Sequence, residues 1–171
     1  MRPARPHWRP AYVGIGSNLN DPRRQVRSAL NALANLSSSR LVSSSRLYRS
    51  KPLDGTDQPD YLNAVAALLT QRDALTFLHE LQSIEKQHGR ERSAVRWAPR
   101  SLDLDLLVFG ELEICNDELI VPHPGMAERS FVLLPLCEIA PHLKVPGRAT
   151  VREMLQQLRA DGSVMAVAVE Q

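Results

Sequence analysis

Two aspartates separated by one residue are the side chains in this sequence best suited to chemistry. Asp103 and Asp105 alternate with leucines in Leu102-Asp-Leu-Asp-Leu106. This alternation predicts a strand with both carboxylates on one face, roughly 7 Å apart at their Cα atoms. Paired carboxylates resist ionising together, and a divalent cation removes that penalty. Mg²⁺ commonly takes one or two carboxylates plus phosphate oxygens, although two solvated acids on a half-exposed strand would give the same pattern.

A cluster of arginines just before the aspartates favours the metal-binding interpretation. Five basic residues and one acid, Glu91, lie between positions 86 and 100; the basic residues are Lys86, Arg90, Arg92, Arg96 and Arg100. Guanidinium groups bind phosphate oxygens in pairs and stay charged. Carboxylates beside an arginine-rich loop at 89–100 therefore predict a phosphoryl-transfer site, which works by positioning and charge neutralisation. The alternative is a loop whose arginines only form ion pairs with Asp103, Asp105 and Glu85.

Composition places these residues in an ordinary globular protein. The chain has 171 residues, 23% of them charged, and a net charge of +2, which argues against a nucleic-acid partner. Its two cysteines, Cys115 and Cys137, match no metal or redox spacing. No apolar run is long enough to span a bilayer. We expect a cytoplasmic monomer without a membrane segment, with a flexible extension at 1–10 and a single catalytic domain at 11–171.

Hydrophobic periodicity predicts the elements that must position the site. Strands are expected at 11–15, 40–48, 61–69 and 102–109, with helices following Asp21-Pro22 and the segment 70–73. Thr70 and Asp73 have the spacing of a capping box with Asp in place of Glu, and Thr150 and Glu153 form a full one. A final edge strand is expected at 164–169. The order βαββαβ predicts an α+β fold, a ferredoxin-like sandwich with one mostly antiparallel sheet and helices packed on it.

Other patterns are weaker when taken alone. Gly14-Ile-Gly16-Ser17-Asn18 follows the first strand but lacks both the Walker lysine and the third glycine of a dinucleotide fingerprint, so it indicates a tight turn. Tyr61 and Asn63 share a strand face, where a ring and an amide can hold a flat heterocycle. His123 lies between two prolines, as loop histidines often do.

Taken together, these residues resemble one enzyme family. The segment from Arg96 to Asp105, Arg-Trp-Ala-Pro-Arg-Ser-Leu-Asp-Leu-Asp, is similar to the signature of the 6-hydroxymethyl-7,8-dihydropterin pyrophosphokinases of folate biosynthesis. Further motifs occur in family order and spacing, namely Gly16-Ser17-Asn18, Gln58-Pro-Asp-Tyr-Leu-Asn63, Glu85 with Gly89-Arg90, and Val121-Pro-His-Pro124. The resemblance covers residues 11–145. Departures from the family pattern stand at Lys51, Ser93 and Pro124.

The resemblance implies a reaction and a set of residue roles. The enzyme would transfer pyrophosphate from ATP to the hydroxymethyl group of the pterin and release AMP, with two Mg²⁺ ions on Asp103 and Asp105. Arg90 and Arg100 would stabilise the transition state. The ATP site would be lined by Gln82, Glu85, Arg92, Trp97, Leu106, His123 and Arg129. The pterin would lie between Tyr61 and Phe131, read by Asn63 and by the backbone near Ser50 and Leu53.

Two other functions fit parts of the sequence. A diverged paralogue would bind nucleotide but act on another substrate. A basic α+β sandwich can also be an RNA-binding module, but such modules stack bases on several strand aromatics, and aromatic residues make up only 5% of this chain. RNA binding would weaken steeply with salt, whereas nucleotide binding at the aspartates would depend on Mg²⁺.

Overall fold

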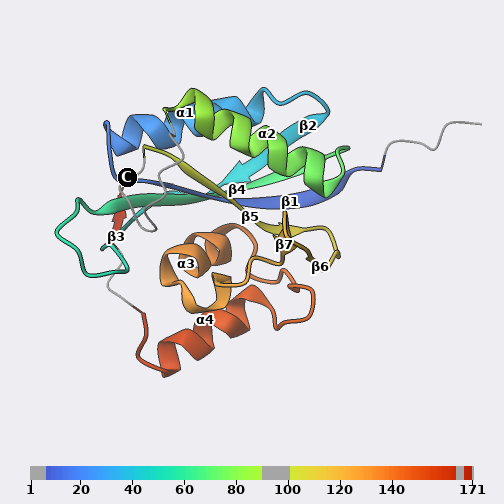
Figure 1. Cartoon of the computed structure of the whole chain (residues 1–171). Coiled ribbons are helices and arrows are strands. Elements are labelled where there is room, and N and C mark those ends of the chain that lie inside the picture. The colour runs from blue at the N-terminus through green and yellow to red at the C-terminus, as the bar shows by residue number, and fades with distance from the viewer. Residues whose placement is uncertain (1–6, 90–100, 165–167, 171) are drawn as a thin grey trace, which may run out of the picture.

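One antiparallel sheet runs through the computed structural model, which describes residues 7–89, 101–164 and 168–170 (Figure 1). In these residues the elements are β1 (Arg9–Ser17), α1 (Pro22–Ala34), β2 (Ser39–Ser44), β3 (Leu47–Ser50), β4 (Tyr61–Thr70), α2 (Ala74–Gln87), β5 (Asp103–Phe109), β6 (Ile114–Cys115), β7 (Ile120–Val121), a 3-10 helix η1 (Met126–Glu128), α3 (Ser130–Ile139), α4 (Val151–Ala160) and β8 (Ala168–Glu170).

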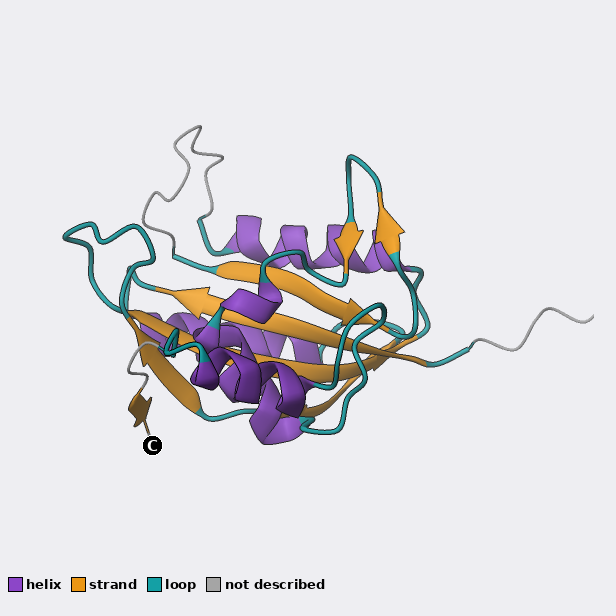
Figure 2. Cartoon of the chain, turned by 90° about the horizontal axis from the view of Figure 1, so that it is seen from below, coloured by secondary structure: helices purple, strands orange, loops and turns teal. Residues whose placement is uncertain are grey.

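The strand order of the sheet confirms the predicted fold class. The order is β5-β1-β4-β3-β8, with β2 also paired to β4, and every described pair is antiparallel. Helices α1 and α2 cover one face, and α3 and α4 cover the other (Figure 1). From below, α3 and α4 lie across the strands (Figure 2). None of the helices in the described residues could cross a membrane.

Alternating side chains on the strands divide the core into two layers. On β1, Ala11, Val13 and Ile15 are buried together with residues of α1 and α2. The rings of Phe77 on α2 and Phe109 on β5 lie 6.0 Å apart on this side of the sheet. The second layer joins the opposite face to α3 and α4, through residues such as Leu133, Leu136, Val151 and Leu155.

The predicted strand at 40–48 is wrong in one respect, because the chain breaks it into β2 and β3 at Ser45. The Ser45 N–H donates to the Val65 carbonyl and the Ser45 hydroxyl accepts from the Val65 N–H, both at 2.9 Å. A side-chain hydroxyl thus replaces a backbone carbonyl in the ladder, and the strand bends there. A further register shift between Leu41 and Ser43 adds a bulge to β2.

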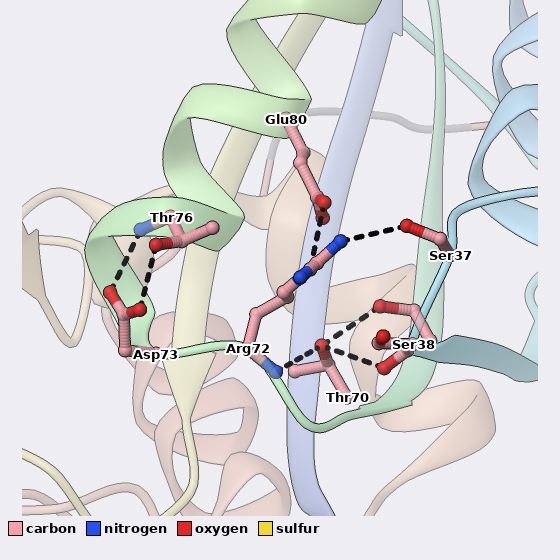
Figure 3. A network of polar contacts seen from close by, with 8 residues as sticks. Ser37, Ser38, Thr70, Arg72, Asp73, Thr76 and Glu80 are labelled. Atoms are coloured by element: carbon pink, nitrogen blue, oxygen red, sulfur yellow. Dashed lines mark hydrogen bonds and ion pairs between the residues drawn. The ribbon is translucent and has the colours of Figure 1, made fainter.

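The capping box predicted at Thr70 is also wrong, because α2 begins three residues later. Thr70 is the last residue of β4, and its hydroxyl accepts from the Arg72 N–H at 3.1 Å. Asp73 is the N-cap, accepting from the N–H and the hydroxyl of Thr76 at 2.9 and 2.7 Å (Figure 3). An aspartate next to the helix satisfies the N-terminal N–H groups more directly than a threonine in the sheet. The box at Thr150 and Glu153 is confirmed.

Replacing the cap aspartate tests this helix start. Hydrogen bonds from the Thr76 side chain and backbone lower the pKa of Asp73 below its ordinary 3.8. The stabilisation of the fold by this ionised cap is therefore present above pH 3.8, the ordinary pKa, and is lost as the pH falls through the lowered pKa of folded Asp73. Asp73→Ala should lower the free energy of unfolding by about 1 kcal/mol at pH 7. Urea titrations at neutral and strongly acidic pH should show the difference shrinking in acid, while Asp73→Asn should stay close to wild type at neutral pH.

Candidate active site

A pocket of about 310 Å³ lies on the sheet face that carries α3, and Phe131 and Val132 of that helix form part of its lining. Five segments line it: β1, the end of β3 with its following loop, β4, β5 and the stretch from His123 to Val132. The loop after β3 projects beyond the end of the sheet, and α3 lies under the same end (Figure 1). Segments distant in sequence therefore converge here because the sheet order brings β5, β1 and β4 side by side.

Two glycines form the floor of the pocket. Gly16 pairs with Asp103 on one side and Asn63 on the other, and Gly14 pairs with Asp105 and Val65 in the same way. A Cβ at Gly16 would lie 3.4 Å from Asn63 Oδ1, so any larger side chain would enter the pocket. The predicted tight turn at this motif is wrong, because Gly14 to Ser17 lie inside β1. Its missed signal is glycine at alternate positions inside a strand, which marks close approach of a ligand.

Asp103 and Asp105 reach the pocket from β5, as their alternation predicts. Both line it, whereas Leu104 and Leu106 are buried among the residues under α1 and α2. Glu85 of α2 is 2% exposed, and its Oε1 accepts from the Leu104 N–H at 2.8 Å. This buried bond ties α2 to the backbone between the two aspartates. It holds the strand that presents both carboxylates.

The donor set at this end of the pocket fits Mg²⁺. Two carboxylates project from one strand into a pocket large enough for a ligand, and Mg²⁺ accepts one or two carboxylates when phosphate oxygens and water complete its shell. In the described parts of the chain, no three His, Cys, Asp or Glu side chains form a metal cluster. Asp103 and Asp105 are therefore the residues that would hold the ion together with a phosphate ligand.

His123 and Arg129 flank Asp105. Asp105 Oδ2 lies 4.0 Å from His123 Nε2 and 3.9 Å from Arg129 Nη1. The Gly125 N–H donates to His123 Nδ1 at 3.2 Å, so in the neutral ring the proton is on Nε2. Burial lowers the pKa of His123, Asp105 opposes the shift, and Arg129 and Arg148 add to it. At neutral pH His123 is therefore an uncharged N–H donor facing the carboxylate end.

The other end of the pocket is aromatic and amide-lined. Tyr61 of β4 and Phe131 of α3 both line it. Asn63 is 5% exposed, and its amide nitrogen donates to Ser50 Oγ at 2.8 Å and to the Tyr48 carbonyl at 3.3 Å. These bonds fix the amide so that Oδ1 is the atom nearest the position of a Gly16 Cβ. The pocket therefore offers an oriented acceptor beside two rings.

The loop between β1 and α1 connects the segments around the pocket. The Asn18 side chain donates to Gln58 Oε1 and to the Pro59 carbonyl, both at 3.3 Å. Asn20 donates to the Ser101 hydroxyl at 2.8 Å. Lys51, the family departure in the loop after β3, forms an ion pair of 2.8 Å with Asp60 of the same loop.

Most of the described residues predicted from the sequence come together in this pocket. Those lining it are Ser50, Leu53, Tyr61, Asn63, Asp103, Asp105, His123, Arg129 and Phe131. The described lining does not include three others, Gln82, Glu85 and Leu106. Leu106 is 4% exposed inside the core, and Glu85 is occupied by the bond to Leu104. The remaining predicted residues, Arg90, Arg92, Trp97 and Arg100, lie outside the residues that the structure describes.

Comparison with known proteins identifies relatives along most of the chain. The family model for 7,8-dihydro-6-hydroxymethylpterin-pyrophosphokinase (HPPK) matches residues 12–141. The 2-amino-4-hydroxy-6-hydroxymethyldihydropteridine pyrophosphokinase of Haemophilus influenzae is 47% identical over 147 residues, covering 86% of this chain and 91% of the relative. The enzyme of the same name from Pseudomonas aeruginosa is 46% identical over 151 residues, covering 88% and 93%.

A solved structure supports the fold. Plasmodium falciparum HPPK-DHPS, crystallised with pterin and p-hydroxybenzoate, superposes with a TM-score of 0.71 at 13% identity, covering 95% of this chain and 46% of that one. The present chain thus spans about half of that protein. Sequence and structure agree, and the chain belongs to the 7,8-dihydro-6-hydroxymethylpterin-pyrophosphokinase family.

Proposed function

We propose that this pocket carries out the family's reaction, transfer of pyrophosphate from ATP to 6-hydroxymethyl-7,8-dihydropterin with release of AMP, in folate biosynthesis. The observation that carries the proposal is that one pocket joins a pair of carboxylates to two aromatic rings and a fixed amide. The first set suits a magnesium–triphosphate group and the second a flat, polar-edged heterocycle. Neither a nucleotide site nor a pterin site alone would need both.

The pterin end binds and orients the acceptor substrate. Tyr61 and Phe131 would enclose the ring, which adds about 0.5–1.5 kcal/mol beyond area burial. Asn63 Oδ1 would accept from an N–H of the pterin's polar edge, with Ser50 and Leu53 beside it. Asn63 and Asp103 face Gly16 from opposite sides, two strand spacings or roughly 10 Å apart. A bicyclic ring read at Asn63 therefore directs its hydroxymethyl group toward the aspartates.

The carboxylate end receives the triphosphate. Asp103 and Asp105 would hold two Mg²⁺ ions, which when bound neutralise phosphate charge and stabilise both the attacking and the leaving oxygen. Arg129 adds a fixed positive charge beside Asp105, and neutral His123 would offer its Nε2–H as a donor to the phosphate. In the transfer, the hydroxymethyl oxygen bonds to the β-phosphorus and releases its proton to solvent, while the bond from this phosphorus to the oxygen shared with the α-phosphorus breaks and that oxygen leaves with AMP. Closure of the loops at 16–22, 49–60 and 89–100 would keep water from that phosphorus.

Several roles are predictions from family resemblance. Arg90 and Arg100 would stabilise the transition-state charge, and Arg92 and Trp97 would contact ATP. Glu85, predicted at the ATP site, accepts a hydrogen bond from the Leu104 N–H and so supports the strand between the two aspartates. Gln82 lies one helical turn before Glu85 on α2. A cytoplasmic monomer and a separate N-terminal extension also stay predictions, but Arg9 and Pro10 of the predicted range 1–10 belong to β1. The diverged paralogue is disfavoured because both ends of the pocket keep the residues that this reaction needs.

Phosphorus NMR of the protein with ATP, Mg²⁺ and 6-hydroxymethyl-7,8-dihydropterin tests the reaction directly. AMP and a pterin diphosphate should accumulate together. ADP in place of AMP would mean attack on the γ-phosphorus and would contradict the proposal. Nucleotide binding without turnover would favour the diverged paralogue.

Removing one metal-binding carboxylate should abolish turnover without unfolding the chain. Asp105→Asn keeps the shape of the side chain but lowers the charge available to a cation. We expect turnover to fall by about 100-fold or more, the scale seen when a transition-state electrostatic contact is lost. AMP release measures this, and Asp117→Asn, an exposed site outside the pocket, is the matched control. Loss of the thermal transition in Asp105→Asn would show instead that the residue supports the fold.

Filling the pocket floor should block the pterin. Gly16 has no positive φ, so Gly16→Val suits the strand backbone, but its methyl groups extend past the 3.4 Å contact with Asn63 into the pocket. We expect pterin affinity to fall by about ten-fold or more with little change in melting temperature. Gly16→Ala, which adds only the Cβ, should have a smaller effect. Equal affinity in wild type and Gly16→Val would place the pterin elsewhere.

A further inference from the structure

A carboxylate outside the pocket connects two of the elements that line it. Glu138 lies in the last turn of α3 and accepts three hydrogen bonds, one from Tyr48 of β3 and two from Arg46 just before this strand. The Tyr48 hydroxyl donates at 2.5 Å, and the N–H and Nε of Arg46 each donate at 3.2 Å. Tyr48 as a whole is 5% exposed, whereas the Arg46 side chain is 59% exposed. Because exposed ion pairs contribute little, the Tyr48 bond is the stronger part of this connection.

Tyr48 also contacts the pocket residue Asn63 through its backbone carbonyl. Its carbonyl accepts from the Asn63 amide at 3.3 Å, and Ser50, two residues further along β3, accepts from the same amide at 2.8 Å. The rotation of the Asn63 side chain is therefore fixed by β3. A displacement of β3 relative to β4 would move the acceptor that reads the pterin.

Helix α3 carries both Glu138 and the pocket residue Phe131. Phe131 and Glu138 are seven residues apart, which is close to two full turns, so both lie on the same face of α3. The helix also contains Pro135, which has no N–H to donate to the carbonyl of Phe131 four residues earlier. The turn that carries Phe131 is therefore less supported by its own helix. Its position depends more on what holds α3 from outside.

The protonation of Tyr48 suits this connection. Burial, followed by the hydrogen bond to Glu138, raises the pKa of Tyr48 to about 12. The Tyr48 hydroxyl therefore keeps its proton at neutral pH and remains a donor to Glu138. Nothing in the proposed reaction uses this pair directly.

We propose that Tyr48 and Glu138 are positioning residues for the pterin, because they hold α3, which carries Phe131, at a fixed offset from β3, which holds Asn63. The pair sets the spacing between the stacking ring and the amide that reads the ring edge. The inference rests on the proposed function, since it assumes that the pterin lies between Tyr61 and Phe131. It assigns this pair to recognition of the acceptor substrate and not to the nucleotide.

The test measures pterin and nucleotide affinity separately in Tyr48→Phe, which removes the hydroxyl and keeps the buried ring. Binding of 6-hydroxymethyl-7,8-dihydropterin is titrated in the presence of Mg²⁺ and α,β-methylene ATP, and binding of the nucleotide analogue is titrated alone. We expect the dissociation constant of the pterin to rise by about five-fold or more, the scale of one lost buried hydrogen bond. The dissociation constant of the nucleotide should not change. In steady state, KM for the pterin should rise more than kcat falls.

A second strand–helix ion pair provides the matched control. Arg72, just after β4, donates to Glu80 of α2 at 3.0 Å and to the Ser37 hydroxyl at 2.7 Å (Figure 3). Like Arg46 and Glu138 it joins sheet to helix, but it lies at the end of β4 opposite Tyr61. Glu80→Gln should lower the melting temperature and leave pterin affinity at the wild-type value.

Each outcome distinguishes the two proposals. Wild-type protein that binds the nucleotide analogue but no pterin would overturn the proposed function. Wild type that binds pterin, with unchanged affinity in Tyr48→Phe, would overturn the positioning role alone. Equal losses of pterin affinity in Tyr48→Phe and Glu80→Gln would show general destabilisation and would also overturn it. If Tyr48→Phe does not fold, Glu138→Met, which removes both acceptor oxygens and keeps an unbranched side chain of similar length, is measured in the same way and must show the same selective loss.

Discussion

Antiparallel pairing of β1 with β4 on one side and β5 on the other is the constraint on which the site depends. It places Asp103, Gly16 and Asn63 in one row across three strands. Hydrogen-bonded strands have a fixed spacing, so the distance between a carboxylate and an amide in this row is set by the backbone ladder. Glycine in the middle of the row keeps the space above the ladder open. The pairing of the strands thus sets the distances between these side chains, and the surrounding loops cover the pocket.

The carboxylate end combines charges whose balance depends on burial. Asp105 lies close to Arg129 and to a half-buried, neutral His123, so its surroundings include one fixed positive charge and one N–H donor. This arrangement places one positive charge and one donor beside a carboxylate that faces the pocket. The buried bond from Glu85 to the backbone at Leu104 holds the strand between the two aspartates. Rigid support of this kind is what an electrostatic site requires, because its dipoles and charges must be oriented before the substrate arrives.

The acceptor end of the pocket is formed by the sheet and by helix α3, which packs on one of its faces. Tyr61 and Asn63 come from the sheet, whereas Phe131 comes from α3, and the two layers are joined through Tyr48 and Glu138. Helix α3 thus has two tasks, since it packs against the second core through Leu133 and Leu136 and also provides one wall of the pocket. A single helix that both packs and lines the pocket couples stability of the layer to recognition of the ligand.

Local signals in the sequence determined much of this protein. Alternation placed Asp103 and Asp105 on one face, the motifs identified the family, and the box at Thr150 and Glu153 marked a helix start, because each depends only on neighbouring residues. The break at Ser45, the cap at Asp73 and the Glu85–Leu104 bond required knowledge of which strand or helix lies alongside. The same holds for Gly14 and Gly16, whose role as a floor appears only when β5 and β4 flank them. Strand order and register arise from contacts between distant segments, and only the tertiary structure decided them, because a one-residue slip in register would turn every side chain to the opposite face.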